Sequence, residues 1–150
     1  MADLRPILLV EDNPKDLELT LAALAKCQLA NEIVVARDGA EALEFLYQRG
    51  PHASRPPGDP AVVLLDLKLP KVDGLEVLEK VKNDPAQRHI PIVMLTSSRE
   101  EQDLVRSYQL GVNAFVVKPV DFREFFEAIQ DLGVFWGIIN EPPPRGPNGG

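Results

Sequence analysis

The chain has 150 residues with a formal net charge of −7 at pH 7, and it is 45% hydrophobic and 26% charged. This balance indicates one folded domain rather than a disordered chain, and the acidity argues against DNA or RNA as a partner, because nucleic acid requires a basic protein face. With one cysteine, no secretory signal and no apolar run near the roughly 20 residues that span a bilayer, we expect a cytoplasmic protein without membrane contact.

Five short apolar runs alternate with segments of helical periodicity. The runs are continuous, which favours strands buried on both faces of a parallel sheet covered by helices. They are Ile7–Val10, Ile33–Ala36, Val62–Leu65, Ile92–Leu95 and Ala114–Val117. In the fourth helical segment, for example, Leu104, Val105 and Tyr108 share one face. Strand and helix alternating five times predict an α/β fold, a (βα)5 doubly wound parallel five-stranded sheet with right-handed crossovers.

Local signals mark where several helices begin and end. Asn13 is placed to cap the first helix, with Pro14 at its first position, where a missing N–H costs nothing. Gly111 is placed to end the fourth helix in a left-handed conformation. Three residue pairs have the spacing of a capping box or its aspartate analogue. These pairs are Asp38 with Glu41, Ser98 with Glu101, and Asp121 with Glu124.

Two stretches fall outside the alternating pattern. The proline-rich residues 51–60 predict an irregular insertion between the second helix and the third strand. Residues 140–150 are rich in proline and glycine and predict a disordered tail. We therefore expect one folded domain over residues 1–139.

Polar residues follow four of the predicted strands. They are Glu11 and Asp12, then Asp66, Thr96 and Lys118. Ligands of an open parallel sheet bind beyond the carboxyl ends of its strands, so we expect these side chains to converge although they are far apart in sequence. Glu11 and Asp12 on their own are equally consistent with a solvated acidic turn that caps the first helix.

Three close carboxylates repel one another, and a divalent cation removes that conflict. Oxygen ligands without histidine or cysteine favour Mg²⁺ or Mn²⁺ over zinc. An aspartate beside such an ion can act as a nucleophile and become an aspartyl phosphate, while a lysine and a hydroxyl neutralise the phosphoryl oxygens. The residue types therefore suit phosphoryl transfer, which depends mainly on positioning and charge neutralisation.

Four sequence motifs, in this order, resemble the receiver domains of response regulators in bacterial two-component systems. They are Leu9-Val10-Glu11-Asp12-Asn13-Pro14, then Leu65-Asp66-Leu67-Lys68-Leu69-Pro70 with Asp73-Gly74, then Leu95-Thr96-Ser97, and finally Phe115-Val116-Val117-Lys118-Pro119. The resemblance extends from about Pro6 to Leu132 and implies a flavodoxin-like fold with strand order 2-1-3-4-5.

The resemblance implies a role for each site residue. Asp66 is expected to be the phospho-acceptor, with Thr96 and Lys118 as the other catalytic groups. Mg²⁺ is the expected cofactor. Its expected ligands are Glu11, Asp12, Asp66 and the backbone carbonyl of Lys68. Pro119 is expected to follow a cis peptide bond, and Thr96 with Phe115 to form the conformational switch.

The partner implied by the resemblance is a sensor histidine kinase. The long proline-rich insertion and the aromatic end of the fifth helix are similar to stand-alone receivers that work with bacterial phytochrome kinases. Lys68 and Ser98 stand at two variable positions that tune the phosphoryl lifetime in this family, in a direction that the sequence does not give.

The fifth helix carries more aromatic residues than one buried face requires. We expect Phe126, Phe135 and Trp136 to form an exposed apolar surface, because such a patch usually marks a partner contact. The hypothesis is a homodimer through the fourth helix, fifth strand, fifth helix and C-terminal segment. The alternative is that the C-terminal residues fold back over their own sheet.

Two other functions remain as alternatives. A hydrolase with an aspartyl-phosphate intermediate resembles a different motif, with a second aspartate where this chain has Lys68. A receiver that serves only as a binding module usually lacks an acid or the lysine, whereas this chain has all of Glu11, Asp12, Asp66, Thr96 and Lys118.

Overall fold

The computed structural model describes residues 5–27, 29–112 and 114–132. These residues form one five-stranded parallel sheet with the strand order β2-β1-β3-β4-β5. The strands are β1 (Ile7–Val10), β2 (Ile33–Ala36), β3 (Val62–Asp66), β4 (Ile92–Thr96) and β5 (Phe115–Val117). The helices are α1 (Pro14–Lys26), α2 (Gly39–Leu46), α3 (Gly74–Lys82), α4 (Arg99–Ser107) and α5 (Phe122–Leu132), with a short 3-10 helix η1 (Gly50–His52). The predicted (βα)5 fold and its strand order are confirmed.

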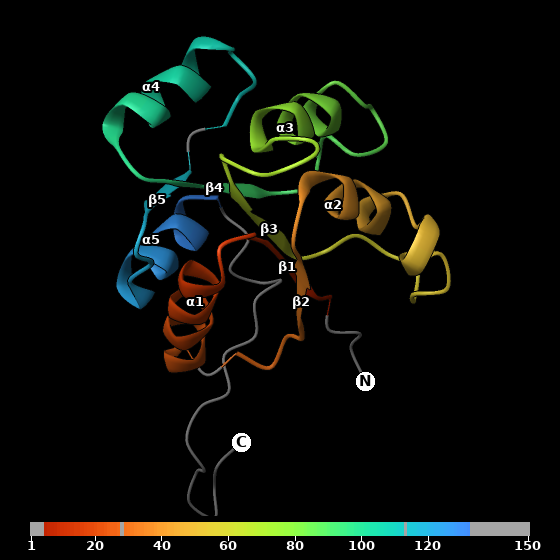
Figure 1. The fold of residues 1–150 in the computed structure, drawn as a ribbon, viewed down its shortest axis with the longest axis horizontal. Helices are drawn as coiled ribbons and strands as arrows, with labels where there is room; N and C mark the ends of the chain where they lie inside the picture. Colours follow the sequence, from red (N-terminus) through yellow and green to blue (C-terminus); the bar gives the residue numbers. More distant parts are fainter. Residues whose placement is uncertain (1–4, 28, 113, 133–150) are drawn as a thin grey trace, which may run out of the picture.

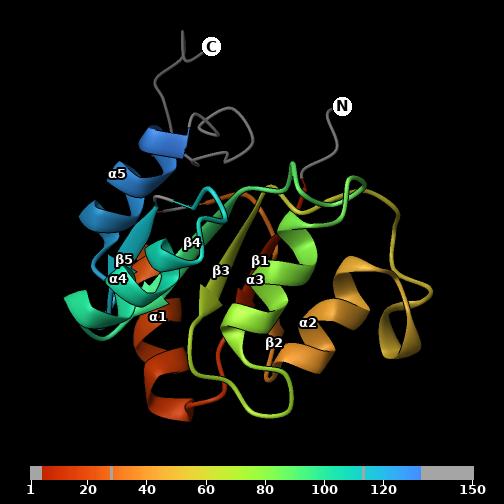
Figure 2. The same ribbon diagram turned by 90° about the horizontal axis from the view of Figure 1, so that it is seen from above.

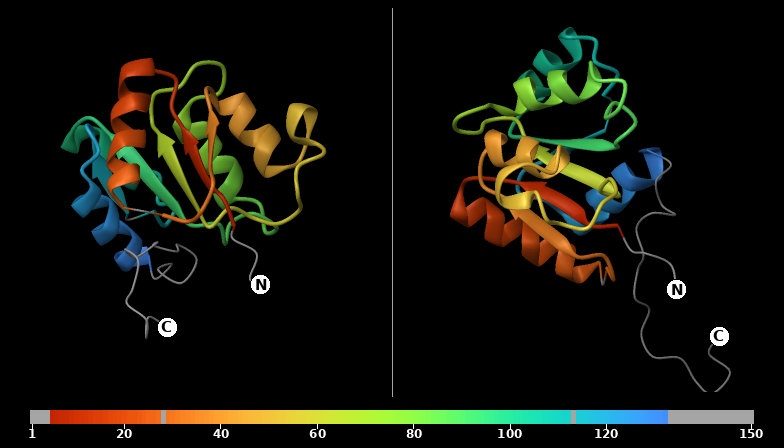
Figure 3. Two further views of the ribbon diagram at one scale, coloured as in Figure 1. Left: turned by 90° about the horizontal axis from the view of Figure 1, so that it is seen from below. Right: turned by 90° about the vertical axis from the view of Figure 1, so that its right-hand side faces the viewer.

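Helices cover both faces of the sheet. Figure 1 shows α1 and α5 on one side and α2, α3 and α4 on the other, and Figure 2 looks down on the three helices lying side by side. Figure 3 shows the sheet edge-on between these two layers. A sheet that is covered on both faces needs strands that are apolar at every position, which explains the continuous apolar runs.

Successive side chains of a strand point to opposite faces, so each strand contributes to two cores. In β1, Ile7 and Leu9 join the cluster that packs against α1 and α5, whereas Leu8 and Val10 join the cluster beneath α2, α3 and α4. All four side chains are 0% exposed. Burial on both faces fixes the strand in place, and with it the residues that follow its last position.

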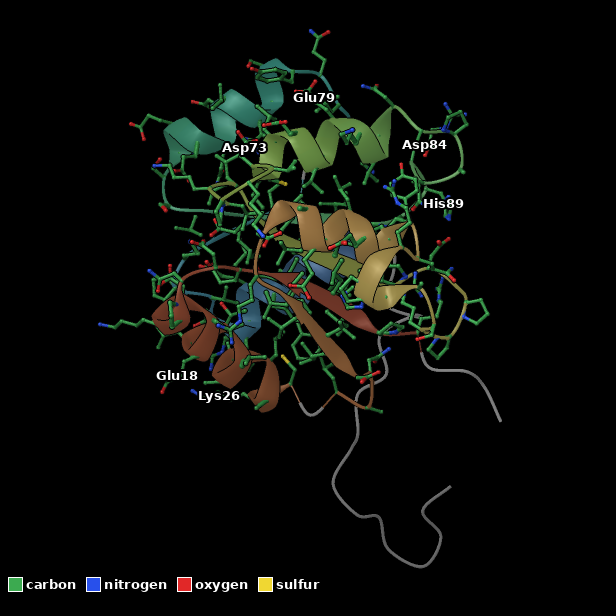
Figure 4. All side chains as sticks on the ribbon, turned by 45° about the vertical axis from the view of Figure 1, so that its right-hand side comes forward. Glu18, Lys26, Asp73, Glu79, Asp84 and His89 are labelled. Carbon is green, nitrogen blue, oxygen red and sulfur yellow. The ribbon has the colours of Figure 1, made fainter. Side chains whose placement is uncertain are left out.

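The helix caps form largely where the sequence predicts them. The Asn13 side chain accepts hydrogen bonds from the backbone N–H groups of Lys15 and Asp16, with Pro14 in the first turn of α1. The Asp38 side chain accepts from the N–H of Glu41 at the beginning of α2, and Ser98 does the same for Glu101 in α4. Figure 4 shows Asp73 at the beginning of α3, where it caps that helix, and Asp84 beyond its end.

Two features of α4 do not follow from the sequence pattern. Of the three apolar residues with the spacing of one helix face, only Val105 is buried; Leu104 and Tyr108 are each 47% exposed. The helix also ends earlier than predicted, at Ser107. Gln109 adopts the left-handed conformation first, with φ of 54°, and Gly111 follows with φ of 79°.

The proline-rich insertion is irregular, as predicted, apart from its first two residues, which lie in η1. It is held against α2 by Arg55, whose guanidinium lies 4.1 Å from the centre of the Phe45 ring and donates to the Phe45 carbonyl. His52 pairs with Glu41 at 3.2 Å. Phe135, Trp136 and the predicted tail 140–150 lie outside the described residues.

Candidate functional site

The predicted site residues meet at the edge of the sheet where its parallel strands end. Glu11 follows the last residue of β1, Asp66 ends β3, Thr96 ends β4 and Lys118 follows β5. Asp66 stands opposite Leu95 in the β3–β4 register, which places Thr96 one residue further along the adjacent strand. The order β1-β3-β4-β5 therefore brings together side chains that are up to 107 residues apart in sequence.

Three carboxylates form the acidic part of the site. One oxygen each from Glu11, Asp12 and Asp66 lies within 4.8 Å of the other two. Glu11 is 0% exposed and Asp66 is 3% exposed, whereas Asp12 is exposed. The backbone N–H groups of Asn13 and Lys68 donate to Glu11 and to Asp66, each at 3.3 Å. An oxygen-only donor set that combines two buried acids with an exposed one suits a hard divalent cation reached from solvent.

Lys118 is the cation of the site. Its Nζ lies 3.1 Å from Asp66 Oδ2, 3.1 Å from Asp16 Oδ2 and 3.5 Å from Glu11 Oε1. The peptide bond between Lys118 and Pro119 is cis. The ammonium of Lys118 therefore contacts two carboxylates of the acidic cluster and one that lies outside it.

The pKa values reflect this crowding. Burial raises the pKa of Glu11 to about 8, and the hydrogen bond and negative charge of Asp66 add to the effect, while Lys118 opposes it. For Lys118, burial alone lowers the pKa, but Asp66, Asp16 and Glu11 outweigh it, so its pKa is raised above the ordinary value. Burial therefore favours the neutral form of the Glu11 carboxyl, and the neighbouring carboxylates favour the charged form of the Lys118 ammonium.

Gly74, which follows Asp73, is required by close packing against the β3–α3 loop that begins after Asp66. The N–H of Gly74 donates to the carbonyl of Leu67 at 2.9 Å. A Cβ atom at this position would lie 2.1 Å from the carbonyl oxygen of Asp66 and 2.7 Å from Cα of Leu67. The beginning of α3 therefore rests directly on the backbone that carries Asp66, and only glycine fits there.

Thr96 and Phe115, the predicted switch pair, are both held by α4. Thr96 is 0% exposed, and its Oγ1 accepts a hydrogen bond of 3.4 Å from Gln102 Nε2. Phe115 is half-buried, with the guanidinium of Arg106 lying 4.5 Å from the centre of its ring. Both contacts come from the side of α4 that faces the sheet edge, so a movement of either residue affects the helix.

Lys68 lies two residues beyond Asp66, and the ion pair of its side chain is with a different residue. Its ammonium pairs with Glu101 Oε2 at 3.3 Å, and its side chain is 80% exposed. The hydrolase alternative requires a second aspartate at this position, where the chain has a lysine that links the β3–α3 loop to α4.

Two functional side chains were missed by the sequence analysis. Asp16, which pairs with Lys118, looks in sequence like any acid in the first turn of a helix. Glu101 was expected only as a capping-box partner, yet its Oε1 accepts from the N–H of Ser97 rather than Ser98, and its Oε2 pairs with Lys68. No sequence signal identifies the Asp16–Lys118 pair or the Glu101–Lys68 pair, because the two residues of each pair lie in different elements.

The face formed by α4, β5 and α5 is partly apolar. Leu104 and Tyr108 are each 47% exposed and Val117 is 41% exposed. A hollow of about 340 Å³ lies between α4 and α5, lined in part by Arg106, Phe115 and Glu124. Phe126, predicted on this surface, is half-buried and packs against the core beneath α1 and α5. None of the helices formed by the described residues has the length and apolar character needed to cross a membrane.

A doubly wound parallel sheet that gathers acids, a buried threonine and a lysine at one edge is the arrangement of two-component receivers. The chain belongs to the response regulator receiver family, since the model of the response regulator receiver domain matches residues 7–130.

The chain is similar to several proteins of known structure or function. The bacteriophytochrome response regulator AtBRR has 76% sequence identity, with 93% of this chain and 100% of that chain covered and a TM-score of 0.89. RtBRR, also a bacteriophytochrome response regulator, has 61% identity, coverage of 95% and 86%, and a TM-score of 0.87. The response regulator Rcp1 of Synechocystis sp. is 40% identical over 130 residues, which are 87% of each chain. The Mn²⁺-bound form of Rcp1 covers 88% of this chain and 94% of its own, at 39% identity and a TM-score of 0.69.

Proposed function

We propose that the chain is a phosphorylation-dependent switch in which Asp66 accepts a phosphoryl group from a sensor histidine kinase. The observation that carries this proposal is the ion pair of 3.1 Å between Lys118 Nζ and Asp66 Oδ2, next to the other carboxylates at the edge of the sheet. An ammonium fixed beside the acceptor carboxylate neutralises the charge that phosphoryl oxygens bring to it.

In the proposed reaction, an oxygen of the Asp66 carboxylate attacks the phosphorus of a phosphohistidine. The new P–O bond forms as the P–N bond breaks, and the imidazole nitrogen leaves with the electron pair and takes up a proton. Thr96 and Lys118 donate hydrogen bonds to the phosphoryl oxygens of the resulting acyl phosphate. Attack by water later releases inorganic phosphate, so the chain catalyses only its own phosphorylation and dephosphorylation.

Access to Asp66 requires a small rearrangement. Only 5% of its side chain is exposed, and 14% of that of Lys118. Lys118 pairs with Oδ2 of Asp66, so a phosphodonor reaches this oxygen when the ammonium shifts toward the incoming phosphoryl oxygens. Asp16, the third partner of Lys118, is 33% exposed.

Mg²⁺ is the proposed cofactor, held by Glu11, Asp12, Asp66 and the backbone carbonyl of Lys68. Carboxylate oxygens that approach within 4.8 Å repel one another, and a divalent cation relieves that repulsion. When bound, the ion supplies Lewis-acid neutralisation of phosphoryl oxygens. The Mn²⁺-bound form of the relative Rcp1 supports a divalent cation in this family.

The proposed partner is a bacteriophytochrome histidine kinase, and the proposed location is the cytoplasm. The similarity to AtBRR and RtBRR, which are bacteriophytochrome response regulators, supports this partner. Signalling is proposed to occur through protein contacts of the α4–β5–α5 face, including a homodimer. Its exposed Leu104, Tyr108 and Val117 support a docking role.

Phosphotransfer from a purified, radiolabelled bacteriophytochrome kinase tests the proposal. The wild-type chain should acquire the label in the presence of Mg²⁺, and Asp66→Asn should not. Asp73→Asn is the matched control, because it makes the same change on the same loop and asparagine retains the cap of α3. Equal labelling of wild type and Asp66→Asn would refute the assignment of the acceptor.

A further inference from the structure

Glu101, in the first turn of α4, contacts the side chain of Lys68, which lies two residues beyond Asp66. Glu101 Oε2 pairs with Lys68 Nζ at 3.3 Å, and Glu101 Oε1 accepts the backbone N–H of Ser97 at 2.7 Å. The Glu101 side chain is only 14% exposed, although that of Lys68 is 80% exposed. One carboxylate thus joins three segments: the acceptor loop, the β4–α4 loop and α4.

Gln102, the next residue of the same turn, contacts Thr96, a second residue of the site. Gln102 Nε2 donates to Thr96 Oγ1 at 3.4 Å, and Thr96 is completely buried at the end of β4. Gln102 and Glu101 are therefore neighbours in sequence that contact two different groups flanking the acceptor, a hydroxyl and an ammonium. Both of these groups are able to donate hydrogen bonds to a phosphoryl oxygen.

We propose that Glu101 and Gln102 are positioning residues that restrain Lys68 and Thr96 in the unphosphorylated chain, and that both contacts are lost when Lys68 and Thr96 move toward a phosphoryl group on Asp66. This inference rests on the proposed function of Asp66. A dianionic phosphoryl group attracts the ammonium of Lys68 and the hydroxyl of Thr96. As those groups turn to it, Glu101 and Gln102 lose their partners, and the first turn of α4 loses two of the contacts that hold it to the site.

The restraint predicts an increase in affinity for a phosphoryl analogue when either residue is changed. Glu101→Gln removes the charge that holds Lys68, but its amide oxygen still accepts from the N–H of Ser97. The affinity for beryllofluoride should rise about two- to fivefold, the range of a partly exposed ion pair. Gln102→Met keeps the length of the side chain without the donor and should raise it roughly two- to tenfold, the range of one hydrogen bond.

The measurement is beryllofluoride binding to the full chain with Mg²⁺, followed by fluorine NMR. Glu100→Gln is the matched control, because it removes the same charge from the same helical turn, and Glu100 is exposed. It accounts for the change in net charge and in the interaction with the helix dipole. Lys68→Gln provides the background in which Glu101 has no ammonium to hold.

The expected result is a gain of affinity in Glu101→Gln that exceeds the gain in Glu100→Gln and disappears in the Lys68→Gln background. An equal gain in Glu100→Gln, or an undiminished gain in the double variant, would overturn the role of Glu101. A Gln102→Met chain that binds no tighter than wild type would overturn the role of Gln102. If the wild-type chain itself binds no beryllofluoride, the proposed function fails, and this inference fails with it.

Discussion

Lys118 is the residue that makes a cluster of buried carboxylates stable. Its ammonium contacts the two buried carboxylates, Glu11 and Asp66, and the partly exposed Asp16, and only 14% of its side chain is exposed. A buried acid that loses its cation must be desolvated without compensation or must take up a proton. The same contacts that prepare the site for phosphoryl oxygens therefore also contribute to the stability of the fold.

Replacing Lys118 with methionine should reduce the free energy of unfolding by about 2 kcal/mol at neutral pH, the range for hydrogen bonds to charged groups. Because the folded-state pKa of Lys118 is raised, its stabilisation is complete at pH 7 and is lost only as the pH rises above the ordinary value of 10.5. Urea unfolding measures the effect. Lys68→Met, whose side chain is 80% exposed, is the control and should cost little; equal losses would contradict this role of Lys118.

Cys27 should be almost unreactive in the folded chain. It is 1% exposed, its Sγ lies 3.6 Å from the Ala23 carbonyl, and burial raises the pKa of its thiol to about 11. At pH 8 only about one thiol in a thousand is then ionised, and the thiolate is the reactive form. Labelling with a maleimide should be slow in buffer and fast in denaturant. Rapid labelling of the folded chain would show that the end of α1 is open.

At the scale of elements, the strands and helix caps are predictable because their signals are local. A continuous apolar run predicts a strand buried on both faces, and Asn13 followed by Pro14 predicts the beginning of α1. The site acids could also be located, since they follow strands. The pairing of Asp16 with Lys118 could not, because it depends on where the fold places the beginning of α1 relative to the residue after β5. The exposure of Leu104 and Tyr108 could not be predicted either, since helical spacing shows which residues share a face but not how much of that face is covered.

The contact between α3 and the acceptor loop gives an element-scale prediction. Gly74→Ala should destabilise the chain by roughly 3 kcal/mol, because the new methyl group would overlap the Asp66 carbonyl and force the two elements apart. Gly111→Ala is the control: its Cβ would meet nothing within 4 Å, so it should cost only about 1 kcal/mol for its positive φ. Thermal unfolding compares the two variants, and a larger loss at Gly111 would contradict the packing described.

At the scale of the whole molecule, the reacting edge of the sheet and the α4–β5–α5 face are adjacent. Thr96 and Phe115 lie in neighbouring strands, and both contact α4, through Gln102 and Arg106. A phosphoryl group at Asp66 is proposed to shift the population of conformations that this face adopts. Partners that bind the exposed apolar residues of α4 and β5 would then bind the phosphorylated and unphosphorylated chains with different affinity.

Association of the chain should depend on this face. Leu104→Ser should weaken any dimer that forms with or without beryllofluoride, because it removes an apolar side chain that is 47% exposed. Leu19→Ser is the control, since Leu19 is 42% exposed but lies on α1, in the opposite layer of helices. Sedimentation velocity measures both variants. A dimer weakened only by Leu19→Ser, or a wild-type chain that stays monomeric in both conditions, would refute the proposed dimer surface.

The central claim, that Asp66 is an acceptor served by Lys118 and a divalent cation, is tested most directly by peptide mass mapping after incubation with acetyl phosphate and Mg²⁺. The account predicts one added phosphoryl group, located on the peptide that contains Asp66, and none when the cation is chelated or when Lys118 is replaced by methionine. A phosphoryl group found on another residue, or unchanged modification of Asp66 in the chelated sample, would contradict it.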